Sequence, residues 1–199
     1  MVNYSEIFST QGMDYQTYRA LIDQLLLEGK ATGDVSYDLH YTKMNVQRMN
    51  RVDKTVSLTE EITSAIDQLT ENYKFLVITE GWCGDAAQIV PVFNKIASAS
   101  LGKIDLKFVL RDKNLPLIDA HLTNGGRAIP VLIILNENAD KVLATWAPRP
   151  QVLQALLKEW KSETTEMTIL AEKLHGWYAK DKTLSTQAEL LEVLKGLEN

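Results

Sequence analysis

The chain has 199 residues, 45% of them hydrophobic, which is enough for one domain with a sizeable core and substantial extra segments. Its 21 basic and 26 acidic residues give a formal net charge of -5, and no run of Lys and Arg is long enough to follow a phosphate backbone, so nucleic acid is not expected as a partner. No basic leader precedes an apolar run, and no segment approaches the roughly 18 consecutive apolar residues of a membrane-spanning helix, which favours a cytoplasmic protein with no membrane partner.

Residues 1–55 are predicted to form a helical N-terminal extension. A helix is expected from Asp14, a suitable N-cap, to Gly29, a suitable C-terminal cap, because apolar residues recur between them at helical spacing. These residues are Tyr18, Leu21, Ile22, Leu25 and Leu26. Residues 31–43 have the composition of a loop, and residues 41–52 form a weaker helical candidate.

The central region, residues 56–161, alternates between helical and strand patterns. Ser57 with Glu60 is a capping box that predicts the start of a helix. Strands are predicted at 74–79, 104–110, 131–135 and 141–146, and further helices at 83–98, near 115–122 and at 150–160. Strands that are apolar throughout belong in a sheet covered on both faces. A helix between the first two strands favours parallel pairing, and a short loop between the last two favours a hairpin. The predicted fold class is therefore α/β, with a mixed four-stranded sheet flanked by helices.

The tail, residues 162–199, is predicted to form a C-terminal helical extension with two helices. An apolar helix face must be buried somewhere, on its own domain or on a second subunit. The pattern leaves both open, so the two extensions are expected to offer a surface for a partner or for a homodimer.

The motif "WCGDA" (82–86) directly follows a buried strand and opens a helix. It resembles the Trp-Cys-Gly-Pro-Cys motif of the thioredoxin superfamily. Pro91 lies eight residues beyond Cys83, like the proline that kinks the active-site helix in thioredoxins, and "GGRAIPVLIIL" is similar to the segment that leads into their cis-proline. The resemblance covers residues 56–160 and implies a thioredoxin-like fold with Pro130 as the cis-proline. Together with the N-terminal extension, the motif is similar to that of uncharacterised bacterial thioredoxin-like groups.

Cys83 is the only cysteine, which excludes an intramolecular disulfide and a metal site made of cysteines alone. The lack of a disulfide fits a reducing compartment. Thiols react as thiolates, and a helix N-terminus favours the thiolate. Asp85 and Glu80 oppose ionisation, but as exposed carboxylates they would be screened. We therefore expect a modestly activated thiol, with Asp85 as a solvated carboxylate at the start of the helix.

Two departures from the family pattern limit the chemistry. The resolving cysteine of family oxidoreductases is replaced by Ala86, and their buried aspartate, six residues before the first cysteine, by Val77. Without a second thiol, a mixed disulfide persists until an external thiol attacks it. The chain cannot run the ordinary dithiol cycle.

The resemblance implies a groove around the thiol. The catalytic candidate is Cys83, and the substrate-binding candidates are Trp82, Gly84, Asp85, Ala86, Ile129 and Pro130. The backbone of Ile129 would pair with an extended peptide. Arg127 near this groove is interpreted as a solvated loop residue. The three histidines (His40, His121 and His175) show no metal-ligand spacing, so neither a metal nor another cofactor is predicted.

Two functions fit these residues. The first is a monothiol thioredoxin-like protein in which Cys83 forms mixed disulfides with a protein or a low-molecular-weight thiol. The second is a redox-inactive peptide- or protein-binding module, indicated by Ala86 and Val77. A third, a glutathione-bridged iron-sulfur carrier like the monothiol glutaredoxins, is disfavoured because Asp85 and Ala86 replace their Phe-Ser.

Overall fold

The computed structural model describes residues 2–33 and 39–198 of the chain. Within these ranges the helices are α1 (Tyr4–Thr10), α2 (Tyr15–Leu27), α3 (Leu39–Thr55), α4 (Glu60–Asp67), α5 (Ala86–Ala99), α6 (Leu115–Asp119), α7 (Gln151–Glu163), α8 (Met167–Asp181) and α9 (Leu184–Leu197). The strands are β1 (Tyr73–Thr79), β2 (Ile104–Leu110), β3 (Val131–Asn136) and β4 (Val142–Trp146), and a short 3-10 helix spans Arg111–Lys113.

The four strands form one mixed sheet in the order β2-β1-β3-β4. β1 pairs with β2 in parallel, which is possible because the helix α5 connects them in a βαβ unit, and β3 is antiparallel to both β1 and β4. The central strands β1 and β3 are buried along almost their whole length. The predicted fold class, an α/β thioredoxin-like fold with a mixed four-stranded sheet flanked by helices, is confirmed.

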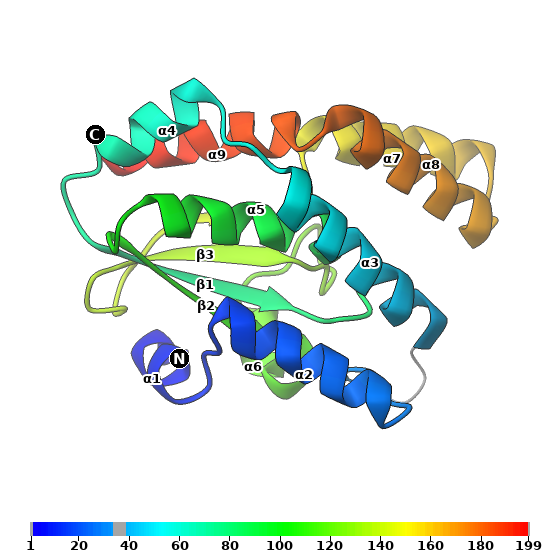
Figure 1. Cartoon of the computed structure of the whole chain (residues 1–199), viewed down its shortest axis with the longest axis horizontal. Helices are drawn as coiled ribbons and strands as arrows, with labels where there is room; N and C mark the ends of the chain where they lie inside the picture. The colour runs from blue at the N-terminus through cyan, green and yellow to red at the C-terminus, as the bar shows by residue number, and fades with distance from the viewer. Residues whose placement is uncertain (1, 34–38, 199) are drawn as a thin grey trace.

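Helices cover both faces of this sheet (Figure 1). α5 lies directly on one face, with α3 packed against it and with α4 and α9 side by side as an outer layer. α1, α2 and α6 lie on the opposite side, and α7 and α8 pack together near one end of the sheet. The C-terminal helices therefore lie on the same side of the sheet as α5.

The N-terminal extension buries its apolar face against the sheet of its own chain. Asp14 caps α2 as predicted, its side chain accepting a hydrogen bond from the backbone N–H of Thr17. The ring of Tyr18 stacks on Phe108 of β2, with 5.3 Å between centroids, and Met13 forms a backbone bridge to the same Phe108. Since Tyr18 is fully buried, α2 is part of the main core.

Two local predictions were wrong, and one helix was missed. The helix predicted from the Ser57 capping box is α4, but its cap is Thr59, whose hydroxyl accepts from the N–H of Ile62. The predicted loop at 31–43 ends early because α3 begins at Leu39, while residues 34–38 lie outside the described residues. The helix α1, capped by Asn3, was missed because it is too short to show a clear periodicity.

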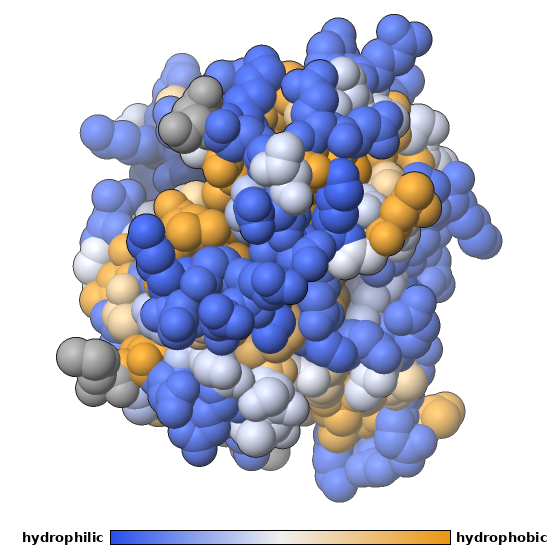
Figure 2. All heavy atoms as spheres, turned by 90° about the vertical axis from the view of Figure 1, so that its left-hand side faces the viewer, coloured by the Kyte–Doolittle hydropathy of each residue, from blue (hydrophilic) through white to orange (hydrophobic). Residues whose placement is uncertain are grey.

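The face on the left-hand side of Figure 1 is covered mainly by hydrophilic residues, with apolar ones in separate patches between them (Figure 2). In the described part of the chain, no helix is both long and apolar enough to span a membrane.

Candidate functional site

Cys83 lies in the turn between β1 and α5, and the fold surrounds its sulfur. The backbone N–H of Ala86 donates to Sγ over 3.4 Å, and the thiol donates to the carbonyl oxygen of Ile129 over 3.3 Å. The Ile129–Pro130 peptide bond is cis. The structure thus brings together three sequence-predicted site residues from two segments, and only 7% of Cys83 is exposed.

The expected activation of the thiol is wrong in this structure. The pKa of Cys83 is raised from its usual value of 9.0 to about 12, mainly by burial and next by the negative charge of Asp85. The hydrogen bond from the Ala86 N–H and the charge of Arg149 act in the opposite direction but are weaker. A position at the start of a helix does not compensate for the loss of water around a buried thiolate.

Asp85 is buried and paired, contrary to the expectation of a solvated carboxylate. Arg149, between β4 and α7, forms a bidentate ion pair with it, with Nε–Oδ1 and Nη2–Oδ2 distances of 3.1 and 2.6 Å. The hydroxyl of Tyr178 in α8 donates to Oδ1 over 2.7 Å. Both partners come from beyond the strands that carry the thiol, so the motif is closed by the C-terminal part of the chain.

The helix α8 also covers Gly84. A Cβ atom on Gly84 would lie 2.9 Å from Cε1 and 3.0 Å from Nε2 of His175, so the imidazole rests directly on this glycine. The pKa of His175 is lowered from 6.5 to about 4, mainly by burial and also by the positive charges of Arg48 and Arg51. At neutral pH the motif is therefore covered by a neutral imidazole.

Glu80, which was expected to be exposed and screened, is fully buried behind the motif. Its Oε1 accepts a hydrogen bond of 3.0 Å from the backbone N–H of Asp112, and its carbonyl accepts from the N–H of Cys83. Burial raises the pKa of this carboxyl group above its usual value. Glu80 thus joins the turn that carries Cys83 to the segment after β2.

The other predicted residues take up different positions. Trp82 is half-buried, and the guanidinium of Arg111 lies 4.6 Å from its ring centroid. Ala86, at the resolving position, is 1% exposed and lies within α5. Arg127 forms a bidentate ion pair with Asp119 in an exposed loop. The Ile129 carbonyl, expected to pair with a peptide, is engaged by the Cys83 thiol.

No strong signal in the sequence pointed to Arg149, Tyr178 or His175 as parts of the site. Both partners of Asp85 are distant from it in the sequence, Arg149 by 64 positions and Tyr178 by 93. The only signal was the helical spacing of the tail around Leu174 and Trp177, which predicted a buried face without saying what it covers.

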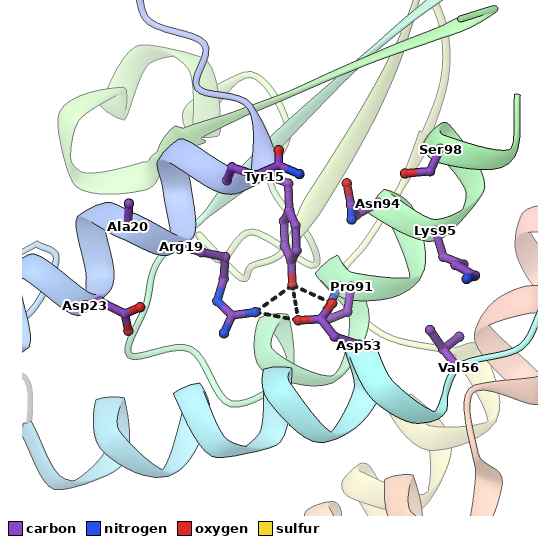
Figure 3. Close-up of a pocket in the computed structure, with 11 residues that line it drawn as sticks. Tyr15, Arg19, Ala20, Asp23, Asp53, Val56, Pro91, Asn94, Lys95 and Ser98 are labelled. Carbon is purple, nitrogen blue, oxygen red and sulfur yellow. Dashed lines mark hydrogen bonds and ion pairs between the residues drawn. The ribbon is translucent and has the colours of Figure 1, made fainter. Parts of the chain in front are cut away.

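Among the described residues there is no group of three or more His, Cys, Asp or Glu side chains placed to hold a metal ion. A cavity of about 610 Å³ lies between α2, α3 and α5, and none of the sequence-predicted site residues lines it (Figure 3). Here the Tyr15 hydroxyl donates to Asp53, and Arg19 donates to both. These contacts join α2 to α3. The cavity is therefore separate from the site around the Cys83 thiol.

Comparisons with known proteins agree with this architecture. A family model described as Thioredoxin matches residues 34–161, more than half of the chain. No curated protein matches. A protein of unknown function from Pseudomonas aeruginosa is similar in structure, with a TM-score of 0.68, 17% identity and 99% of each chain covered. An HIV epitope scaffold is also similar, with a TM-score of 0.65, 17% identity, and 98% of this chain and 99% of that chain covered. At such identity the two structures share only the fold.

Proposed function

The chain belongs to the thioredoxin family, and from that premise we propose that it is a single-cysteine protein that acts by forming one mixed disulfide at Cys83. The partner is a protein or a low-molecular-weight thiol. We extend the proposal to a cytoplasmic location and to membership of the bacterial thioredoxin-like groups, on the basis of the single cysteine and the WCGDA motif.

The proposed reaction is a thiol-disulfide exchange. Cys83 loses its proton, and its sulfur attacks one sulfur of a disulfide R–S–S–R′. A bond forms between Cys83 and the R sulfur, the S–S bond of the substrate breaks, and R′ leaves as a thiolate that takes up a proton. An external thiol later reverses the adduct by the same exchange, because Ala86 supplies no second sulfur.

The observation that carries this proposal is the placement of the sulfur. It lies between the N–H of Ala86 and the carbonyl of Ile129, beside Pro130, where two separate segments converge. A cysteine that served only as a core residue would not need this convergence at the start of a helix.

The raised pKa of Cys83 should make both the formation and the decay of the mixed disulfide slow. Little thiolate forms at neutral pH, so attack on a disulfide is slow while α8 covers the motif. A thiol of high pKa is also a poor leaving group, so a mixed disulfide at Cys83 decays slowly. We propose a long-lived adduct rather than rapid turnover.

The second candidate, a redox-inactive peptide- or protein-binding module, is compatible with the same burial of Cys83. Its thiol would be a packed core group. Under this reading the binding surface would lie beside Trp82, and the thiol would take no part.

Exposure of the reduced, folded protein to oxidised glutathione, followed by mass spectrometry, tests the proposal. We expect one glutathione adduct, released by added thiol and absent from a Cys83→Ser variant. A protein that accepts glutathione only after denaturation would contradict the proposal. Partner or peptide binding that is unchanged in Cys83→Ser would then favour the binding module.

A further inference from the structure

A cavity of about 390 Å³ lies between α3, α5 and the turn from α8 to α9. This volume is in the range of pockets that hold small molecules. Buried Val52 and Val56 form part of its lining, and Arg51 and Lys182 bring two positive charges to it. The described lining residues include no Asp or Glu.

The positive charges here have no carboxylate partner among the described residues. Neither Arg51 nor Lys182 takes part in any of the ion pairs found there. The nearest acidic residues in the sequence are engaged elsewhere: Asp53 with Arg19, and Asp181 with the N–H and hydroxyl of Ser185. The cavity is therefore electropositive without internal compensation.

Arg51 is an exposed residue, but a hydrogen bond anchors its guanidinium. One of its nitrogens, Nη2, donates to Oε1 of Gln88 over 2.8 Å, and Gln88 is 3% exposed. The other end of this amide lies 3.3 Å from Nδ1 of His175. A guanidinium carries five N–H donors in a planar fork, so a single bond to Gln88 leaves donors for a ligand.

Lys182 is presented by an unusual turn. Lys182 and Thr183 have φ values of 52° and 71°, in the left-handed region that non-glycine residues rarely adopt. Two consecutive residues in this region connect α8 to α9 and place Lys182 at the cavity, opposite α3. The turn positions Lys182, and the buried amide of Gln88 holds Arg51, so that both cations line the same cavity.

We propose that this cavity binds the anionic group of a small molecule, a carboxylate or a phosphate, with Arg51 and Lys182 as its charge partners. Carboxylates and phosphates match the planar donor fork of arginine, and a lysine adds a second, compact charge. The apolar side chains of the lining suit the carbon skeleton attached to that group. The site does not require that the proposed thiol chemistry take place.

Titration of the full-length, reduced protein with inorganic phosphate and, separately, with succinate tests this site. The probes contain no sulfur, so the result is independent of the reactivity of Cys83. At constant ionic strength we expect saturable binding of at least one probe, with NMR shifts of the backbone amides of Lys182 and Thr183. The probe that binds more tightly distinguishes a phosphate from a carboxylate ligand.

Arg51→Gln and Lys182→Gln should each weaken this binding about tenfold, the loss expected for one charge-assisted hydrogen bond. Lys158→Gln, which removes an exposed lysine from α7, is the matched control and should bind like the unaltered protein. Absence of saturable binding for both probes would overturn the proposal. Equal binding by all three variants, or NMR shifts confined to other regions, would do the same.

Discussion

The hydroxyl of Tyr178 donates a hydrogen bond of 2.7 Å to the carboxylate of Asp85, joining helix α8 to the motif that carries the only cysteine. Arg149 pairs with the same carboxylate, and His175 rests on Gly84. The pKa of the buried Cys83 is raised mainly by its burial and next by the charge of Asp85. Each of these contacts can be altered separately.

Asp85→Asn should lower the pKa of Cys83 below about 12, because the carboxylate next to the thiol is removed. The same change leaves the half-buried Arg149 without its charge partner, so the free energy of unfolding should fall by on the order of 2 kcal/mol. Thiol titration by alkylation and denaturant unfolding measure the two effects. Asp105→Asn, at an exposed position of β2, should change neither; a thiol pKa that stays unchanged in Asp85→Asn would contradict the assigned cause.

Gly84→Ala should destabilise the contact between the motif and α8, because the new methyl group would meet the His175 ring at 2.9 to 3.0 Å. We expect a loss of about 1 to 3 kcal/mol in unfolding free energy, typical of overpacking, and faster alkylation of Cys83. His175→Ala in the same chain should relieve most of this loss. A double-mutant cycle measures the coupling, and additive effects of the two changes would show that the ring does not rest on Gly84.

Glu80→Gln should increase stability at neutral pH. The folded pKa of Glu80 is raised by burial, so the folded state favours the protonated form, and ionisation of the group costs stability as the pH rises from its unfolded value towards its folded value. The glutamine keeps an acceptor for the Asp112 N–H but does not ionise. The advantage of the variant over the unaltered protein should therefore grow with pH through this window, as followed by urea unfolding at several pH values. An advantage independent of pH would mean that Glu80 titrates normally.

Ala86→Cys should restore a resolving thiol, three residues after Cys83 and at the first residue of α5. The backbone N–H of residue 86 lies 3.4 Å from the Cys83 sulfur. A cysteine side chain at position 86 would therefore start close to that sulfur. A glutathione adduct on this variant should be lost without added thiol, with formation of an intramolecular disulfide that mass spectrometry detects. An adduct as persistent as in the unaltered protein would show that the second sulfur cannot reach the first.

The sequence predicted most of the fold because its signals are local. The apolar strands, the helical spacing from Asp14 to Gly29 and the position of WCGDA each follow from residues near one another. The surroundings of Cys83 could not be predicted in this way. Burial of Asp85 depends on Arg149 and Tyr178, which lie far along the chain, and a helix start alone indicates activation of a thiol only when water remains nearby.

The measurement that tests the account most directly is the rate of alkylation of Cys83 as a function of pH, in the folded and in the denatured protein. Because the pKa of the buried thiol is raised to about 12, the rate in the folded protein should be the slower of the two at neutral pH and should still be rising above pH 9. A folded protein in which the rate levels off below the usual thiol value of 9.0 would contradict the account, because Cys83 would then be an activated thiolate.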